Sequence, residues 1–298
     1  MRLMVASPST PVSRSPLRRF LEARGTLGGI DVLHLDARMR TRDGVDLAAA
    51  YIPRHGGGSA AASDAAILLV HGFGASGRKP SYARLAAALA TYAPVLALDL
   101  RGHGHSGGVC TLGDREVLDV EAALGWLAGI GHHTLVAIGA SMGASAVLGA
   151  AASGIDLAGV VSISGPATFR EVVPPGPLRQ LQDVWYSPVR RAALRAGLRI
   201  RLAAPSRWSF PPDPEVAAGR IRAPLLVIHG VDDAYFPVDD ARRLVAAAGG
   251  ATSLWLAGPG FGHAEDGFSD AFATALGAAV SMVLTTGRFP HTTEPRAF

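Results

Sequence analysis

Short apolar runs alternate with longer amphipathic segments from about residue 66 onward. The runs are four or five residues long, which is typical of strands buried on both faces of a sheet. The expected strands cover residues 66–70, 95–98, 134–138, 159–163, 224–228 and 253–256. Helical spacing covers residues 82–90, 114–128, 144–152, 239–248 and 266–283. Strands that alternate with helices in this way predict an α/β protein with a mostly parallel sheet and helices on both faces.

The segment before this alternation has a different pattern. Residues 32–38 and 45–52 read as strands on either side of Arg42-Asp43-Gly44, a hairpin turn signal. Residues 1–30 are rich in Ser, Pro, Arg and Gly, and we expect a flexible basic tail with a short helix over 17–23. One folded domain is therefore expected over residues 31–298.

The alternation is interrupted once, at about residues 166–222. This stretch holds nine prolines and a helix candidate near 189–202. A connection of this length inside a compact domain is usually functional. We therefore expect an insertion that serves the site rather than the core.

Composition narrows the class of protein. The chain has 298 residues, of which 49% are hydrophobic and 17% charged, so it is too apolar to be disordered. No apolar run reaches the roughly 18 residues that a membrane helix needs, so no stable membrane insertion is expected. The N-terminal residues lack the apolar core of a secretory signal. The single cysteine, Cys110, excludes an internal disulfide and a multi-cysteine metal site, and a reducing cytoplasm is the expected location.

The positive charge is unevenly distributed. The net charge is +4 and the pI about 9.7. Residues 166–222 hold ten arginines and four acids, residues 1–30 hold five arginines and one acid, and the other residues are net acidic. A high pI is compatible with nucleic-acid binding, but no zinc-finger, helix-turn-helix or RRM signature accompanies it, so no nucleic-acid partner is expected.

The glycine pattern of dinucleotide-binding proteins occurs twice, at residues 72–77 and 102–107. The first copy follows an expected strand, and Asp99 stands about 20 residues beyond it, where a ribose-binding acid belongs. The helix should begin within the motif, however, and here it is delayed to about Ser81. With 36 glycines in the chain such matches arise by chance, so the sequence predicts no nucleotide cofactor.

The nucleophile-elbow pattern G-x-S-x-G also occurs twice, at Gly104–Gly108 and Gly139–Gly143. The chemistry requires a strand, a sharp turn and a helix directly afterwards, so that the serine stands clear of the backbone. Ser141 has an expected strand before it and a helix after it. Ser106 lies in a loop with no helix until about residue 114. Ser141 is therefore the candidate nucleophile and Ser106 a loop residue.

A serine nucleophile needs a base, which in this arrangement follows it in the chain. Three histidines follow Ser141. His229 ends an expected strand and is interpreted as structural, whereas His291 lies in a Pro/Thr-rich tail. His263 sits in a glycine-rich loop after the last expected strand, which makes it the candidate base.

The acid and the oxyanion donors of the site are expected in loops that follow strands. Asp232 and Asp233 both follow the expected strand 224–228, and their spacing alone does not choose between them as the acid that orients the base. An oxyanion needs backbone N–H donors, one from the residue after the nucleophile and one from an earlier loop. These requirements point to the N–H groups of Met142 and Phe73.

The motifs together resemble the α/β-hydrolase superfamily over about residues 32–285. The matching segments are 71–74, 99–106, 139–143, 229–237 and 262–263. The pattern is most similar to the serine-aminopeptidase and lysophospholipase-like esterase group. In the family's acid loop, His-Gly-x-x-Asp with Pro four residues on, the catalytic acid aligns with Asp233. Serine at position 141 disfavours haloalkane dehalogenases and epoxide hydrolases, which carry aspartate there.

The resemblance implies an α/β-hydrolase fold over residues 31–298, with a small helical cap at about 166–222. It implies two-step acyl transfer by Ser141, His263 and Asp233 on a small carboxylic ester or thioester, without a metal or organic cofactor. Peptidase, lactonase, haloperoxidase and lyase chemistry use the same constellation, and a non-catalytic binding protein on this fold is a further alternative.

The sequence sets neither the substrate nor the oligomeric state. Arginines of the expected cap raise one more hypothesis, namely that their field favours anionic substrates or lipid surfaces. These arginines are Arg190, Arg191, Arg195 and Arg199.

Overall fold

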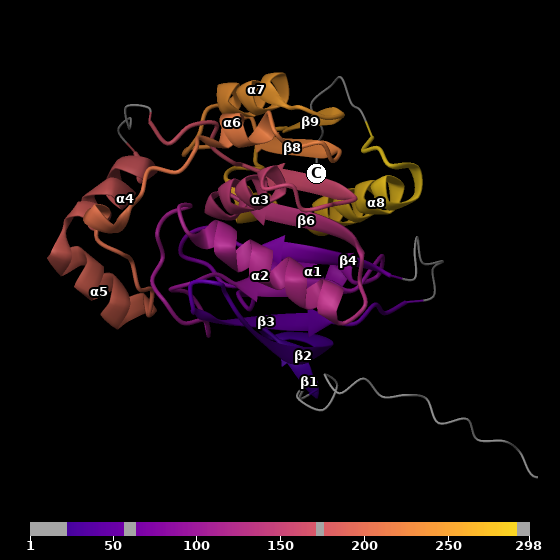
Figure 1. Cartoon of the computed structure of the whole chain (residues 1–298), viewed down its shortest axis with the longest axis horizontal. Coiled ribbons are helices and arrows are strands. Elements are labelled where there is room, and N and C mark those ends of the chain that lie inside the picture. The colour runs from indigo at the N-terminus through magenta and orange to yellow at the C-terminus, as the bar shows by residue number, and fades with distance from the viewer. Residues whose placement is uncertain (1–22, 57–63, 171–175, 291–298) are drawn as a thin grey trace, which may run out of the picture.

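A computed structural model describes residues 23–56, 64–170 and 176–290 (Figure 1). These residues form a nine-stranded sheet in the order β1-β2-β3-β5-β4-β6-β7-β8-β9. The strands are β1 Ala23–Leu27, β2 Ile30–Arg40, β3 Asp46–Ile52, β4 Ala65–Val70, β5 Val95–Asp99, β6 Thr134–Ala140, β7 Gly159–Ile163, β8 Leu225–Gly230 and β9 Thr252–Ala257. The α-helices are α1 Pro80–Leu89, α2 Glu116–Gly129, α3 Met142–Ala152, α4 Pro177–Tyr186, α5 Pro188–Leu198, α6 Pro214–Ala218, α7 Val238–Ala247 and α8 Asp270–Thr286.

The sheet is antiparallel at its beginning and parallel through the rest. Strands β1, β2, β3 and β5 pair antiparallel in succession, and every pair from β5 through β4 to β9 is parallel. Every residue of strands β4 to β8 is buried except Thr134 at the start of β6, which explains their short apolar sequences. Helices α1 and α8 contribute to the core on one face, and α2, α3, α6 and α7 to the core on the other. The predicted fold, a mostly parallel sheet with helices on both faces, is confirmed.

The folded part begins earlier than the sequence indicated. Strand β1 lies within the expected tail of residues 1–30 and pairs with β2 through Leu27 and Ile30. Gly28 and Gly29, with φ of 56° and 80°, form the two-residue turn between them. A Gly-Gly pair adopts positive φ readily and is itself a hairpin signal in the sequence. The expected helix over 17–23 lies outside the described residues except for Ala23, which is in β1.

The C-terminal helix α8 begins later than the sequence predicted. The expected helix 266–283 is divided into a short 3₁₀ turn, Ala264–Gly267, and α8. The Ser269 hydroxyl accepts a hydrogen bond from the Phe272 N–H at 3.0 Å and so caps α8. This cap sets the later beginning of the helix.

The stretch 166–222 contains two unlike parts. Helices α4 and α5 form a hairpin, residues 176–199, that stands away from the sheet (Figure 1). The expected helix 189–202 ends at Leu198, because Arg199 adopts a left-handed conformation with φ of 57°. Helix α6 instead packs against α3 and α7 and belongs to the core.

The α4–α5 hairpin is tied to the body just beyond its end. The N–H of Cys110 donates to the carbonyl of Arg201 at 2.7 Å, and the N–H of Ala203 donates to the carbonyl of Cys110 at 2.8 Å. Within the part of the chain that the structure describes, no helix has both the length and the apolar character needed to cross a bilayer.

Candidate active site

Ser141 occupies the tight turn between β6 and α3. Its backbone has φ of 53° and ψ of −119°, and its N–H donates to the carbonyl of Ile163 at 2.8 Å. The flanking glycines permit this turn. A Cβ on Gly139 would lie 2.3 Å from the carbonyl oxygen of Gly143, and one on Gly143 would lie 2.5 Å from the carbonyl oxygen of His71. The strained backbone places the serine side chain above the carboxyl edge of the sheet.

The His263 side chain contacts both other candidate residues. Its Nδ1 lies 2.8 Å and 3.0 Å from the two carboxylate oxygens of Asp233, and its Nε2 lies 2.9 Å from Ser141 Oγ. An ionised carboxylate only accepts, so Nδ1–H donates to Asp233 and Nε2 accepts from the serine hydroxyl. The Tyr235 ring stacks on the imidazole with 4.2 Å between ring centroids and fixes its plane. The arrangement can remove a proton from Ser141.

Asp233 is held as a charged group. Its carboxylate also accepts from the N–H groups of Tyr235 at 2.8 Å and Phe236 at 3.1 Å. Burial raises the pKa of Asp233, but the hydrogen bond and charge of His263, together with these two N–H groups, hold its pKa below the usual range. Asp233 is therefore an anion opposite His263 at neutral pH.

Asp232 serves the same loop in a different way. Its carboxylate accepts from the N–H of Gly260 at 2.7 Å and from the N–H of Gly262 at 3.0 Å. These two hydrogen bonds lower the pKa of Asp232. The structure thus brings Asp233 to the His263 ring and Asp232 to the backbone that carries His263.

The other serine and histidine candidates have different surroundings. Ser106 is 2% exposed, and its hydroxyl accepts from the Ala48 N–H at 2.8 Å and donates to the Asp99 carbonyl. His229 is fully buried and donates from Nε2 to the Phe236 carbonyl at 3.0 Å, which supports the loop of Asp233. His291 lies outside the described residues.

The loop after β4 runs against the serine. A Cβ on Gly72 would lie only 3.1 Å from the Cβ of Ser141, so glycine permits this approach. The N–H of Gly72 donates to the Tyr82 hydroxyl at 3.1 Å, and the N–H of Gly74 donates to Nε2 of His103 at 3.3 Å. The N–H groups on both sides of Phe73 are therefore occupied.

The N–H of Phe73 itself lies between these two. Among the described residues it donates no hydrogen bond to the protein, and the same holds for the N–H of Met142, the first residue of α3. Neither donor is therefore occupied by the described part of the protein. The N-terminus of α3 also carries the positive end of the helix dipole, which favours a developing negative charge.

Two buried histidines fix this loop, and the sequence interpretation did not identify them. His71 accepts at Nε2 from the Leu100 N–H at 3.0 Å and donates from Nδ1 to the Gly72 carbonyl at 2.7 Å. His103 donates from Nδ1 to the Arg101 carbonyl at 3.1 Å. Burial lowers the pKa of His71 to about 4 and that of His103 to about 3. Both rings are neutral at pH 7, which leaves Nε2 of each free to accept.

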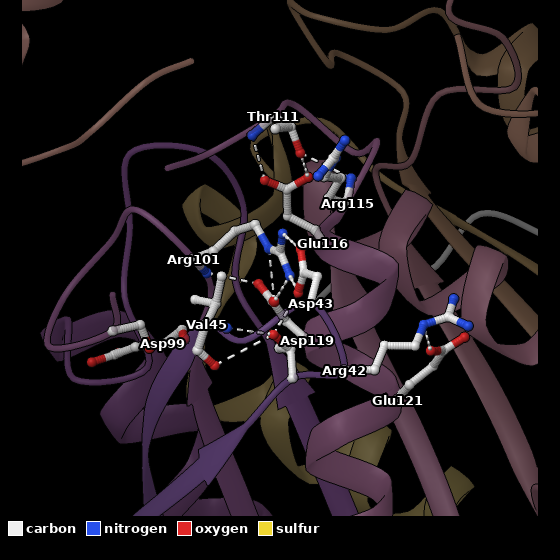
Figure 2. Close-up of polar contacts among 12 residues, drawn as sticks. Arg42, Asp43, Val45, Asp99, Arg101, Thr111, Arg115, Glu116, Asp119 and Glu121 are labelled. Carbon is white, nitrogen blue, oxygen red and sulfur yellow. Dashed lines mark hydrogen bonds and ion pairs between the residues drawn. The ribbon is translucent and has the colours of Figure 1, made fainter. Parts of the chain in front are cut away.

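Buried charges hold the loop after β5 (Figure 2). Arg101 is 2% exposed and donates to Asp119 at 2.8 Å and to Asp43 at 2.8 Å and 3.0 Å. The hydrogen bond from Arg101 lowers the pKa of Asp43 to about 2. Glu116 accepts from the N–H and the hydroxyl of Thr111 at 2.6 Å and 2.8 Å. These side chains form hydrogen bonds with one another or with the backbone and stabilise the conformation of the loop.

A cavity of about 510 Å³ lies between α2, α3 and residues 209–214. Ser145, Phe169 and Phe210 are among its lining residues, and the residues of the Ser141–His263–Asp233 arrangement are not. Within the described ranges, no cluster of three or more His, Cys, Asp or Glu side chains is arranged to hold a metal ion.

Solved structures similar to this one are named as esterases or hydrolases. The Pyrococcus furiosus esterase Pf2001 has a TM-score of 0.61 and 21% identity, covering 94% of this chain and 98% of that one. The esterase RhEst1 from Rhodococcus sp. ECU1013 has a TM-score of 0.61 and 18% identity, covering 84% and 98%. An alpha/beta hydrolase from Novosphingobium aromaticivorans has a TM-score of 0.57 and 20% identity, also covering 84% and 98%.

At these identities the structures establish a common fold. The sequence comparison goes further, because residues 67–297 match the profile of the alpha/beta hydrolase family. This match extends over most of the chain and includes the segments that hold Ser141, Asp233 and His263. The chain belongs to the alpha/beta hydrolase family.

Proposed function

We propose that the protein is a serine hydrolase that cleaves a carboxylic ester or thioester through an acyl-enzyme. The observation that carries the proposal is the His263 ring, which lies 2.8 Å from Asp233 Oδ2 at one nitrogen and 2.9 Å from Ser141 Oγ at the other. A nucleophile, a base and an orienting acid within hydrogen-bond reach of one another constitute the machinery of acyl transfer.

In the first step Ser141 Oγ attacks the carbonyl carbon of the substrate while its proton passes to Nε2 of His263. The negative charge of Asp233 stabilises the imidazolium that forms. The carbonyl oxygen becomes an oxyanion and accepts from the N–H groups of Phe73 and Met142. Collapse of the intermediate expels the alcohol or thiol, which takes the proton from Nε2 and leaves an ester on Ser141.

In the second step water replaces the leaving group. His263 removes a proton from the water, and the resulting oxygen nucleophile attacks the acyl carbon. The same two N–H groups hold the second oxyanion. The bond to Ser141 Oγ then breaks, the serine regains its proton from His263, and the carboxylic acid leaves.

The insertion and the single cysteine suggest how the substrate reaches the site and where in the cell the protein acts. We propose that the part of residues 166–222 outside the core acts as a cap for a small acyl substrate, with the α4–α5 hairpin as its exposed part and residues 200–203 as its attachment to the body. We also propose a cytoplasmic location, since the single cysteine is buried and the described fold needs no disulfide.

Labelling with a fluorophosphonate tests the assignment of the nucleophile. The wild-type chain should be labelled and the Ser141→Ala variant should not. Ser145→Ala is a matched control, because Ser145 lies one helical turn away on α3 with a buried hydroxyl that makes no hydrogen bond in the structure. Labelling that persists in Ser141→Ala, or that is lost in Ser145→Ala alone, would contradict the proposal.

A panel of p-nitrophenyl esters and acyl thioesters of varied chain length tests the reaction. We expect turnover that the Ser141→Ala substitution reduces by several orders of magnitude. Labelling of Ser141 without turnover of any ester or thioester would direct attention to amides, lactones or the other chemistries of this fold. Absence of both labelling and turnover would indicate a binding protein and would refute the proposed hydrolase.

A further inference from the structure

The α4–α5 hairpin exposes hydrophobic side chains. No residue of either helix is buried. The exposed fraction is 77% for Val189, 68% for Leu198 and 61% for Tyr186. Figure 1 shows the two helices side by side at the margin of the molecule. Exposed apolar groups gathered on one protruding element are characteristic of an interaction surface.

Helix α5 has an inner and an outer face that can be told apart. Leu194 is half-buried and packs against the core, and Arg191 donates from its guanidinium to the Trp185 carbonyl on the same side. At 3.6 residues per turn, the opposite face carries Val189, Ala192, Ala193 and Ala196. All four are exposed. The outward face of the helix is therefore apolar, whereas the outer face of an ordinary surface helix is polar.

Arginines flank this outward face. Arg190 lies at one border, and Arg195 and Arg199 lie toward the other. Residues 176–199, which form the hairpin, contain five arginines and one acid, Asp183. Asp183 lies 3.8 Å from Arg190 with both side chains more than half exposed, and such a pair offsets little of the charge. The hairpin therefore combines an apolar face with a strongly positive border.

We propose that the α4–α5 hairpin docks on the surface of an anionic lipid bilayer. Val189 and the alanines of α5 would enter the boundary between headgroups and acyl chains. The guanidinium groups at the borders would reach lipid phosphates while their stems lie along the apolar region. A dissolved anion would satisfy the arginines but not the apolar face, so the pairing of the two favours a membrane surface. The proposal goes beyond the hydrolase activity and does not depend on it.

Binding to vesicles tests this surface. The Ser141→Ala chain at full length is used, so that hydrolysis of lipid cannot alter the vesicles. It is mixed with vesicles of phosphatidylcholine alone or of phosphatidylcholine and phosphatidylglycerol in equal amounts, and bound protein is measured by co-sedimentation. We expect binding only to the anionic vesicles, weakening as sodium chloride is raised. Equal binding to both vesicle types, or binding to neither, would overturn the proposal.

Substitutions assign the binding to the hairpin. Each arginine near an anionic surface strengthens binding roughly fivefold, so a combined Arg190→Gln, Arg195→Gln and Arg199→Gln variant should bind about a hundredfold more weakly. Val189→Ser should weaken binding by about tenfold. The matched control changes Arg84, Arg242 and Arg288, which are exposed outside the hairpin, to Gln and should bind as the parent does.

Two results with the substituted variants would contradict the proposal. If the hairpin variant binds like the parent, another basic segment such as residues 1–30 is responsible and the proposal is wrong. If the control loses as much affinity as the hairpin variant, the attraction is only that of net charge, which also refutes a specific surface. Because ester turnover plays no part in the readout, failure of the proposed hydrolase activity would leave this test intact.

Discussion

The backbone N–H of Gly74 donates a hydrogen bond to Nε2 of the buried His103 at 3.3 Å. His103 belongs to the loop after β5, whereas Gly74 belongs to the loop after β4 beside Ser141. The bond engages the N–H that follows Phe73, as the Tyr82 hydroxyl engages the N–H that precedes it. The orientation of the Phe73 N–H therefore depends on a histidine 30 residues away in the chain.

We predict that His103 positions the Phe73 N–H for catalysis. His103→Leu removes the acceptor and should lower kcat by about tenfold to a hundredfold, below the full loss of an oxyanion donor. KM should change little, because the donor acts on charge that develops in the transition state. His103→Gln keeps an acceptor oxygen and should recover part of the rate. An equal change of kcat and KM in both variants would instead indicate general disruption.

Substitution of Asp233 should lower kcat far more than substitution of its neighbour Asp232. Asp233→Asn removes the charge that holds the His263 tautomer and should reduce kcat by about 10⁴-fold. Asp232→Asn keeps an oxygen that can accept from Gly260 or Gly262, and we expect a loss of no more than roughly tenfold. A larger loss for Asp232→Asn than for Asp233→Asn would reverse the two assignments.

The parallel part of the fold was predictable because its signals are local. Strands β4 and β8 are buried on both faces, and residues 65–70 and 225–228 read as plain apolar runs. The strand–Ser141–helix pattern is equally local. Since the carboxyl ends of parallel strands meet at one edge, the sequence also indicated that His263 and an aspartate would lie near the serine.

The features that the sequence did not predict depend on contacts between loops. His71 and Leu100 are 29 residues apart, and their hydrogen bond follows only from the adjacent positions of β4 and β5. Asp232 and Asp233 are neighbours in sequence, and the turn that follows β8 decides which of them faces the imidazole. Strand β1 has no such local signal, because Gly28-Gly29 stands in a segment without an apolar run.

Two glycines on helices should respond oppositely to alanine. A Cβ on Gly143 would lie 2.5 Å from the His71 carbonyl oxygen and 2.6 Å from that of Val70, both main-chain atoms. Gly143→Ala should therefore lower the free energy of unfolding by about 1–3 kcal/mol. Gly125 on α2 is exposed with nothing within 4 Å of the added carbon, so Gly125→Ala should raise it by about 0.5–1 kcal/mol. Urea unfolding of both variants checks the signs, and a shift in the same direction would contradict the packing.

The single thiol should be inert in the folded protein. Cys110 is fully buried, and burial raises the pKa of its thiol well above the usual value. Because the thiolate is the reactive species, we expect no reaction with Ellman's reagent in native buffer and one equivalent in guanidinium chloride. Rapid reaction of the native chain would place Cys110 near solvent.

Stability should fall with acid through the two buried histidines. The folded-state pKa values of His71 and His103 are about 4 and about 3, against an ordinary value of 6.5. Between these limits the unfolded chain binds more protons than the folded one, so the free energy of unfolding decreases as the pH falls below about 6.5. Each histidine contributes a slope of about 1.4 kcal/mol per pH unit.

The His103→Gln variant isolates one of these contributions. Glutamine does not titrate, so the variant should lose stability less steeply than the wild type, by about 1.4 kcal/mol per pH unit between roughly pH 6 and pH 4. Urea unfolding at several pH values measures both slopes, and any constant loss from the substitution cancels in the comparison. Parallel curves for the two proteins would mean that the His103 ring binds a proton as readily in the folded state as in the unfolded one. That result would exclude a neutral acceptor at Nε2 and, with it, the hydrogen bond from Gly74.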